Sequence, residues 1–126
     1  MVQVEIAQLT AECNSWRDAL RKYREEFTQD KAKLQQAAHH TLSKDQLQDV
    51  EHLHNQFHIQ LINIHDLKQA IKGHDRKMAY ETGVNAGQLN DETVAEHENL
   101  FDQYQHLEQT LLELRDEFNS FLNRTR

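Results

Sequence analysis

No proline interrupts this 126-residue chain, and its apolar residues return at intervals of three and four along almost the whole length. Because an α-helix turns once every 3.6 residues, this spacing keeps the apolar side chains on one face of a continuous helix. Proline would break such a helix, and the chain has only three glycines to weaken one. The sequence therefore predicts an all-α fold built from long amphipathic helices.

The first helix is predicted over residues 2–39. Its row of apolar residues on one face, which we call a seam, consists of Val2, Ile6, Leu9, Cys13, Trp16, Leu20, Tyr23, Phe27 and Leu34. Asp30 occupies the seam position between Phe27 and Leu34, and Ala37 continues the same spacing. A buried carboxylate at that position would need a partner.

A second helix is predicted over residues 43–80. Ser43 followed by Gln46 matches the capping box that begins many helices. We expect Gly73 to lie within this helix, because ending it there would leave a loop of about 17 residues. The seam is predicted through Leu47, Val50, His54, Phe57, Leu61, Ile64, Lys68, Ile71 and Met78, with Leu53 and Leu67 widening it on one flank.

A third helix is predicted over residues 91–124, after a connection with two glycines and two asparagines. Asn90 or Asp91 is expected to cap this helix. Its seam alternates strictly between steps of three and four: His97, Leu100, Tyr104, Leu107, Leu111, Leu114, Phe118 and Phe121.

Three helices of this length would each extend roughly 50 Å at about 1.5 Å per residue. Connections of a few residues force neighbouring helices to run antiparallel. We therefore predict one domain over residues 1–126, an elongated up-down-up three-helix bundle with coiled-coil-like seams.

In helix number, helix length and the position of Trp16 on the first seam, the chain resembles a spectrin repeat in shape. Spectrin repeats usually carry another tryptophan in the third helix, where this chain has Tyr104 and phenylalanines. They also commonly join the second and third helices more tightly. The resemblance thus implies a shape, and it implies no ligand or activity.

Composition excludes several classes of partner. The formal net charge is -7, which repels nucleic acid and anionic membrane surfaces. Residues 1–13 contain neither a basic segment nor a continuous apolar run, so we expect no signal peptide and no membrane-spanning segment. The single cysteine cannot form an internal disulfide. A cytoplasmic location is the default expectation.

The chain carries nine histidines, and three of them follow one strip of the second predicted helix. His54 and His58 are four residues apart, and His65 lies seven residues beyond His58. These three residues are weak candidates for a zinc or copper site, since a closed site needs further ligands that one helix rarely supplies. The alternative, which we favour, is that they flank the seam and bond carboxylates of adjacent helices.

Other chemistry receives less support from the sequence. A di-iron carboxylate site needs two Glu-x-x-His pairs on facing helices, and only Glu51 and His54 form a convincing one. No catalytic triad or phosphate-binding loop can be assigned. Cys13, Trp16 and Tyr104 have the spacing of core residues. We therefore expect no cofactor and no enzymatic activity.

Asp30 lies near His54 if the first turn centres on residue 41. We predict a hydrogen bond or ion pair between Asp30 and His54 that fixes the register of the two helices. Ile59 and Ile62 fall off the predicted seam and could mark an interface. The leading hypothesis is a non-catalytic helical bundle that acts through protein contact or self-association, and the alternative is a histidine-based metal-binding or pH-responsive bundle.

Overall fold

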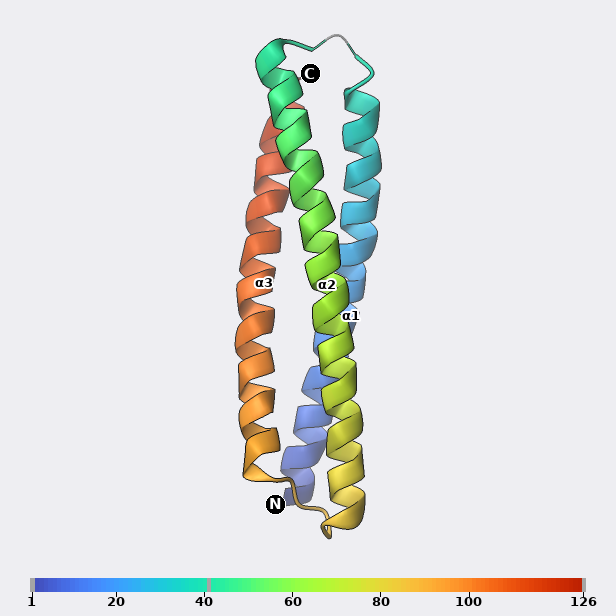
Figure 1. Ribbon diagram of the computed structural model, residues 1–126, viewed down its shortest axis with the longest axis vertical. Coiled ribbons are helices and arrows are strands. Elements are labelled where there is room, and N and C mark those ends of the chain that lie inside the picture. Colours follow the sequence, from blue (N-terminus) through green and yellow to red (C-terminus); the bar gives the residue numbers. More distant parts are fainter. Residues whose placement is uncertain (1, 41, 126) are drawn as a thin grey trace.

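A computed structural model describes the backbone of residues 2–40 and 42–125, with side chains from Ile6 onward. These residues form three helices, α1 (Val2–Ala37), α2 (Lys44–Val84) and α3 (Asp91–Arg124). Figure 1 shows them side by side along one long axis, with α1 and α3 running in the same direction and α2 running against them. Both α1 and α3 pack closely against α2. The predicted all-α, up-down-up three-helix bundle is confirmed.

The helix boundaries differ from the prediction at three ends. Helix α1 ends at Ala37 rather than residue 39, and α2 runs from Lys44 to Val84 rather than from residue 43 to residue 80. The later end of α2 arises because the chain leaves the helix through left-handed conformations at Ala86 and Gly87, with φ of 55° and 82°. Gly87 adopts this conformation without the steric cost that a Cβ would add. Gly73 lies inside α2, as expected.

The start of α2 has the predicted capping box. The Gln46 amide N–H donates to the Ser43 hydroxyl oxygen at 3.1 Å, and the Ser43 amide N–H donates to the Gln46 side-chain oxygen at 2.9 Å. These two bonds satisfy backbone donors that have no partner within the helix. They fix where α2 begins.

The start of α3 is tied to the end of α2 through a buried glutamate. Asn90 is the N-cap but makes no side-chain capping bond. Instead, the Glu81 carboxylate accepts the Thr93 hydroxyl at 2.6 Å and the Asn90 amide at 3.0 Å. Both bonds lower the pKa of Glu81, and the bond from the Thr93 hydroxyl has the larger effect. Asn90 thus occupies the predicted N-cap position, and Glu81 holds the start of α3 against the end of α2.

Part of the core is an aromatic cluster formed by one phenylalanine from each helix. The Phe57 ring lies 5.5 Å from that of Phe27 and 5.2 Å from that of Phe118, between centroids. All three are at most 1% exposed. The first and third predicted seams supply most of the remaining core: Cys13, Trp16, Leu20, Leu34, Leu100, Leu111, Leu114 and Phe121.

The seam of α2 passes through Leu53 and Leu67, where the prediction placed His54 and Lys68. Leu53 is buried and its neighbour His54 is half-buried, and the same relation holds for Leu67 and Lys68. The buried residues of α2 alternate in steps of four and three: Leu53, Phe57, Gln60, Ile64, Leu67, Ile71, His74, Met78 and Glu81. The flank predicted to widen the seam is thus the seam itself, because its leucines exclude water better than a histidine or a lysine does.

Among the residues that the structure describes, no helix combines the length and apolarity needed to cross a membrane.

Candidate metal centre

The three histidines singled out in the sequence do not meet in a site. His58 and His65 are exposed and His54 is half-buried along α2. Within the described part of the chain, the one cluster of three potential metal donors contains none of them. The reason is the register of α2, which directs Leu53 and Leu67 into the core and leaves this histidine strip outside it.

The predicted pairing of Asp30 with His54 is not found among the described side chains, which show neither a hydrogen bond nor an ion pair between them. Asp30 is buried, as its seam position requires, with 8% of its surface exposed. Burial raises its pKa, and the charges that act on it are those of Glu26, Lys33 and Arg115. The shifted seam of α2 brings Leu53, and not His54, into the core.

The two isoleucines predicted as a possible interface lie on the surface of α2. Ile59 is 45% exposed and Ile62 is 47% exposed.

The cluster of metal donors lies elsewhere, with one residue from each helix. It consists of Cys13 in α1, His74 in α2 and His97 in α3, and we call it the three-donor cluster. Their ligand atoms all lie within 4.8 Å of one another. His74 Nε2 is 3.0 Å from His97 Nδ1, and Cys13 Sγ is 4.0 Å from the same Nδ1. The residues are 0%, 1% and 4% exposed, respectively.

The seams explain how this cluster forms. Cys13 and His97 are seam residues of α1 and α3, so their side chains must point inward. His74 is the seam residue of α2 seven positions after Leu67. Cys13 and His97 lie near the starts of α1 and α3, and His74 lies near the end of α2. Because α2 runs antiparallel to the other two helices, these three positions lie at the same level along the bundle axis. The fold therefore places a thiol and two imidazoles together in the core.

Two neutral imidazoles have too few N–H protons to donate to every acceptor beside them. Two neutral rings carry two N–H protons, and the 3.0 Å contact between the rings uses one. The outer nitrogen of each ring faces a carboxylate: His74 Nδ1 is 3.3 Å from Glu96 and His97 Nε2 is 3.5 Å from Glu12. Only one outer nitrogen then carries a proton, and the other directs a lone pair at an anion.

Neither outer nitrogen has a hydrogen-bond partner of good geometry within the described part of the chain, although the carboxylates are within ion-pair distance. A cation bound between the inner nitrogens would resolve the conflict. Both inner lone pairs would then point to the cation, and both outer N–H groups would face Glu12 and Glu96. Carboxylates that hold the second nitrogen of a ligating histidine are a common feature of metal sites.

The donor separations also approach those of a bound transition metal. A tetrahedral ion with metal–nitrogen bonds of about 2.0 Å and a metal–sulfur bond of about 2.3 Å holds nitrogens about 3.3 Å apart and nitrogen and sulfur about 3.5 Å apart. The distances of 3.0 Å and 4.0 Å to His97 Nδ1 are within about 0.5 Å of these values. The whole set lies within 4.8 Å, so side-chain rotations would have to bring the donors closer together around an ion.

An aromatic wall and two ion pairs surround the cluster. The Trp16 ring lies 4.9 Å from that of His97 and 5.8 Å from that of Phe101, between centroids. At the outer edge, Arg17 pairs with Asp75 at 3.3 Å and Lys77 pairs with Glu96 at 3.2 Å. The donors thus lie in an apolar setting whose rim is charged.

Burial sets the protonation states of the donors. It raises the pKa of the Cys13 thiol to about 12, with the Asp75 carboxylate adding to the effect. It also lowers the pKa of His74, against the opposing effect of Glu96. At neutral pH the cysteine is a thiol and His74 is a neutral imidazole, so a metal ion must displace the thiol proton to form a bond with sulfur.

A second polar cluster lies between α1 and α3 near the middle of the bundle. Tyr23 and Tyr104 both donate to the same carboxylate oxygen of Glu108, each at 3.1 Å. Arg115 forms a two-bond pair with Glu26, with both distances 2.9 Å. Each polar group in these contacts has a partner, so this cluster is satisfied internally and serves to align the two helices.

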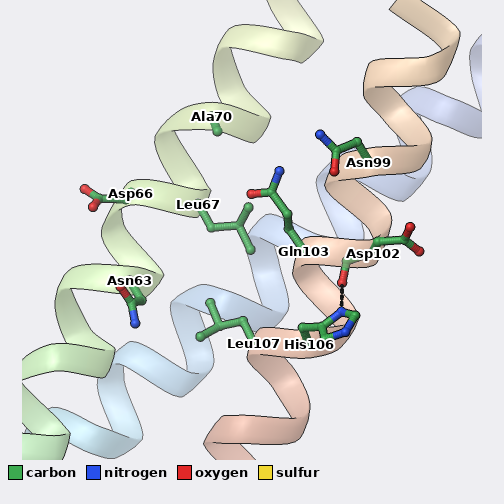
Figure 2. Close-up of a pocket in the computed structure, with 9 residues that line it drawn as sticks. All are labelled: Asn63, Asp66, Leu67, Ala70, Asn99, Asp102, Gln103, His106 and Leu107. Atoms are coloured by element: carbon green, nitrogen blue, oxygen red, sulfur yellow. Dashed lines mark hydrogen bonds between the residues drawn. The ribbon is translucent and has the colours of Figure 1, made fainter.

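A groove of about 540 Å³ lies between α2 and α3, and Figure 2 shows the residues that line it. Its floor contains Leu67 and Leu107, and its rim carries amides and two carboxylates, those of Asp66 and Asp102. His106 Nδ1 donates to the backbone carbonyl of Asp102 at 2.8 Å, so this imidazole is held against its own helix. The groove therefore brings together no set of reactive groups comparable to the three-donor cluster.

Sequence reasoning placed Cys13 and His97 on seams but did not connect them, and it missed His74. A signal for His74 was present in the chain: a seven-residue repeat from Leu53 through Gln60 and Leu67 leads directly to it.

No family model, no curated protein and no solved structure matches this chain.

Proposed function

We propose that this protein is a metal-binding helical bundle that holds one transition-metal ion at Cys13, His74 and His97. The observation that carries the proposal is the convergence of these three buried donors, one from each helix, within 4.8 Å. Polar groups in a core need partners, and two neutral imidazoles that share one N–H between them have only one N–H left for Glu12 and Glu96. A bound cation satisfies all of them at once.

The donor types restrict the class of ion. Thiolate and imidazole are ligands of zinc, copper and related transition metals, whereas magnesium and calcium prefer oxygen. The proposal is of the same class as the histidine-based metal function expected as an alternative from the sequence, but it uses a different set of histidines.

Calorimetric titration with zinc tests the proposal. Because the donors are buried, the protein is titrated both as folded and during refolding from urea. We expect one ion per chain, and we expect binding to be lost in His74→Ala and His97→Ala. His58→Ala is the matched control, since it removes an exposed histidine of the same helix as His74. Binding that persists in both core variants, or that is lost equally in His58→Ala, would disprove the proposal.

Protein contact, the leading hypothesis from the sequence, is a second candidate. The exposure of Ile59 and Ile62, at 45% and 47%, supports an apolar surface on α2 that could join two copies of the chain. Sedimentation equilibrium tests this candidate. A dimer mass that is reduced to the monomer by Ile59→Ser with Ile62→Ser supports it, and a monomer at all concentrations rejects it.

A further inference from the structure

The three-donor cluster leaves a bound ion one ligand short of a closed zinc site. Structural zinc is almost always held by four ligands in a tetrahedron. Within the described part of the chain, no fourth histidine, cysteine, aspartate or glutamate joins Cys13, His74 and His97. A fourth donor, if the protein supplies one, must therefore be of another type.

Met78 carries a donor of another type, a thioether. It is one of two methionines in the chain, it is 1% exposed, and it belongs to the same buried core as Cys13. It lies four residues after His74 on the α2 seam, so the two residues share one face of the helix. Long side chains in helices extend over the turn N-terminal to their own Cα, and for Met78 that turn carries His74.

These donors together are soft. A thiolate, two imidazoles and a thioether form a set that suits copper, and thiolate and thioether in particular favour copper(I). The softness of the donors thus favours copper(I) over zinc.

We infer that the site takes copper(I), bound by the Cys13 thiolate, His74 and His97, with the Met78 thioether as a fourth donor. This inference rests on the proposed metal-binding function and specifies the ion. On binding, the Cys13 S–H bond breaks and a Cu–S bond forms, and the proton leaves to solvent. Copper enters and stays as Cu(I), so no electron is transferred.

The test compares two ions and two core variants in the full chain. Copper(I) affinity is measured without oxygen by competition with a chromogenic copper(I) chelator, and cobalt(II) affinity is measured by absorption titration. The variants are Met78→Leu, which nearly conserves volume, and Ile71→Leu, a matched change one turn before His74 on the same seam. Circular dichroism verifies that both remain helical.

We expect Met78→Leu to weaken copper(I) binding roughly tenfold or more and to change cobalt(II) binding less than about threefold, because thioether is a good ligand for the softer ion only. Ile71→Leu should leave both affinities unchanged. X-ray absorption at the copper edge should detect two sulfur neighbours in the wild type and one in Met78→Leu.

Equal copper(I) affinity and one sulfur neighbour in both proteins would overturn the role of Met78. Stoichiometric cobalt(II) binding without stoichiometric copper(I) binding would overturn the copper assignment while leaving the proposed metal-binding function intact. If neither ion binds at Cys13, His74 and His97, both proposals fail.

Discussion

Replacing both core histidines by leucine should stabilise the metal-free protein. In His74→Leu with His97→Leu, two nearly buried rings give way to apolar side chains at positions 1% and 4% exposed. Each outer nitrogen without a good partner costs about 1–3 kcal/mol, and the lost bond between the rings contributed about 1 kcal/mol. We expect a net gain of about 3 kcal/mol in the free energy of unfolding.

A bound metal should reverse that order. An ion at a free concentration about 1,000 times its Kd stabilises the wild type by about 4 kcal/mol and leaves the double variant unchanged, because that variant has lost two ligands. The wild type should therefore be less stable than the variant in chelator and at least as stable in saturating metal. For a chain of this length, about 1 kcal/mol corresponds to roughly 4 °C in Tm.

The assay is urea and thermal unfolding followed by circular dichroism, in chelator and then in zinc. A matched control is His58→Leu with His65→Leu, which alters two exposed histidines of α2 and should change stability by less than about 0.5 kcal/mol in either condition. The opposite result would be a double core variant that is less stable than the wild type in chelator. It would mean that the paired imidazoles stabilise the core without an ion.

Three further predictions follow from the packing and the titratable groups. Phe57→Ala should destabilise the protein by about 4 kcal/mol in urea unfolding, because the ring is fully buried between two other rings, whereas Phe101→Ala, at a position 40% exposed, should cost under about 1 kcal/mol. The pKa of Asp30 is raised in the folded protein, so its carboxyl ionises more easily in the unfolded chain. The free energy of unfolding therefore falls as the pH rises from the ordinary pKa of 3.8 to the folded-state pKa. Asp30→Asn should therefore raise Tm at pH 7 and lose this advantage below the ordinary pKa of 3.8, and a constant difference at all pH values would contradict the argument. Metal binding should release one proton per ion from Cys13, measurable by calorimetry in buffers of different ionisation enthalpy, and no release would mean that sulfur does not bind the ion.

The fold could be predicted from the sequence because it depends on periodicity, and periodicity is repeated dozens of times along this chain. Its boundaries depend on single residues. The end of α2 was predicted four residues early, since the left-handed turn at Ala86 and Gly87 is a backbone choice that the spacing of apolar residues does not specify.

The site was harder to predict because it depends on register. A seam of α2 drawn through His54 and Lys68 fits the apolar residues almost as well as the observed one through Leu53 and Leu67. That choice decides whether His74 faces the core and whether Asp30 meets His54. Cys13 and His97 each had the spacing of an ordinary core residue, so only their proximity in the folded chain makes them chemically informative.

If Cys13, His74 and His97 hold one metal ion, the refolded protein should bind cobalt(II) at these residues in an absorption titration. We expect tetrahedral ligand-field bands and a thiolate-to-cobalt charge-transfer band that saturate at one ion per chain, with the charge-transfer band lost in Cys13→Ser. The absence of a saturating spectrum, or a charge-transfer band that survives in Cys13→Ser, would contradict this expectation.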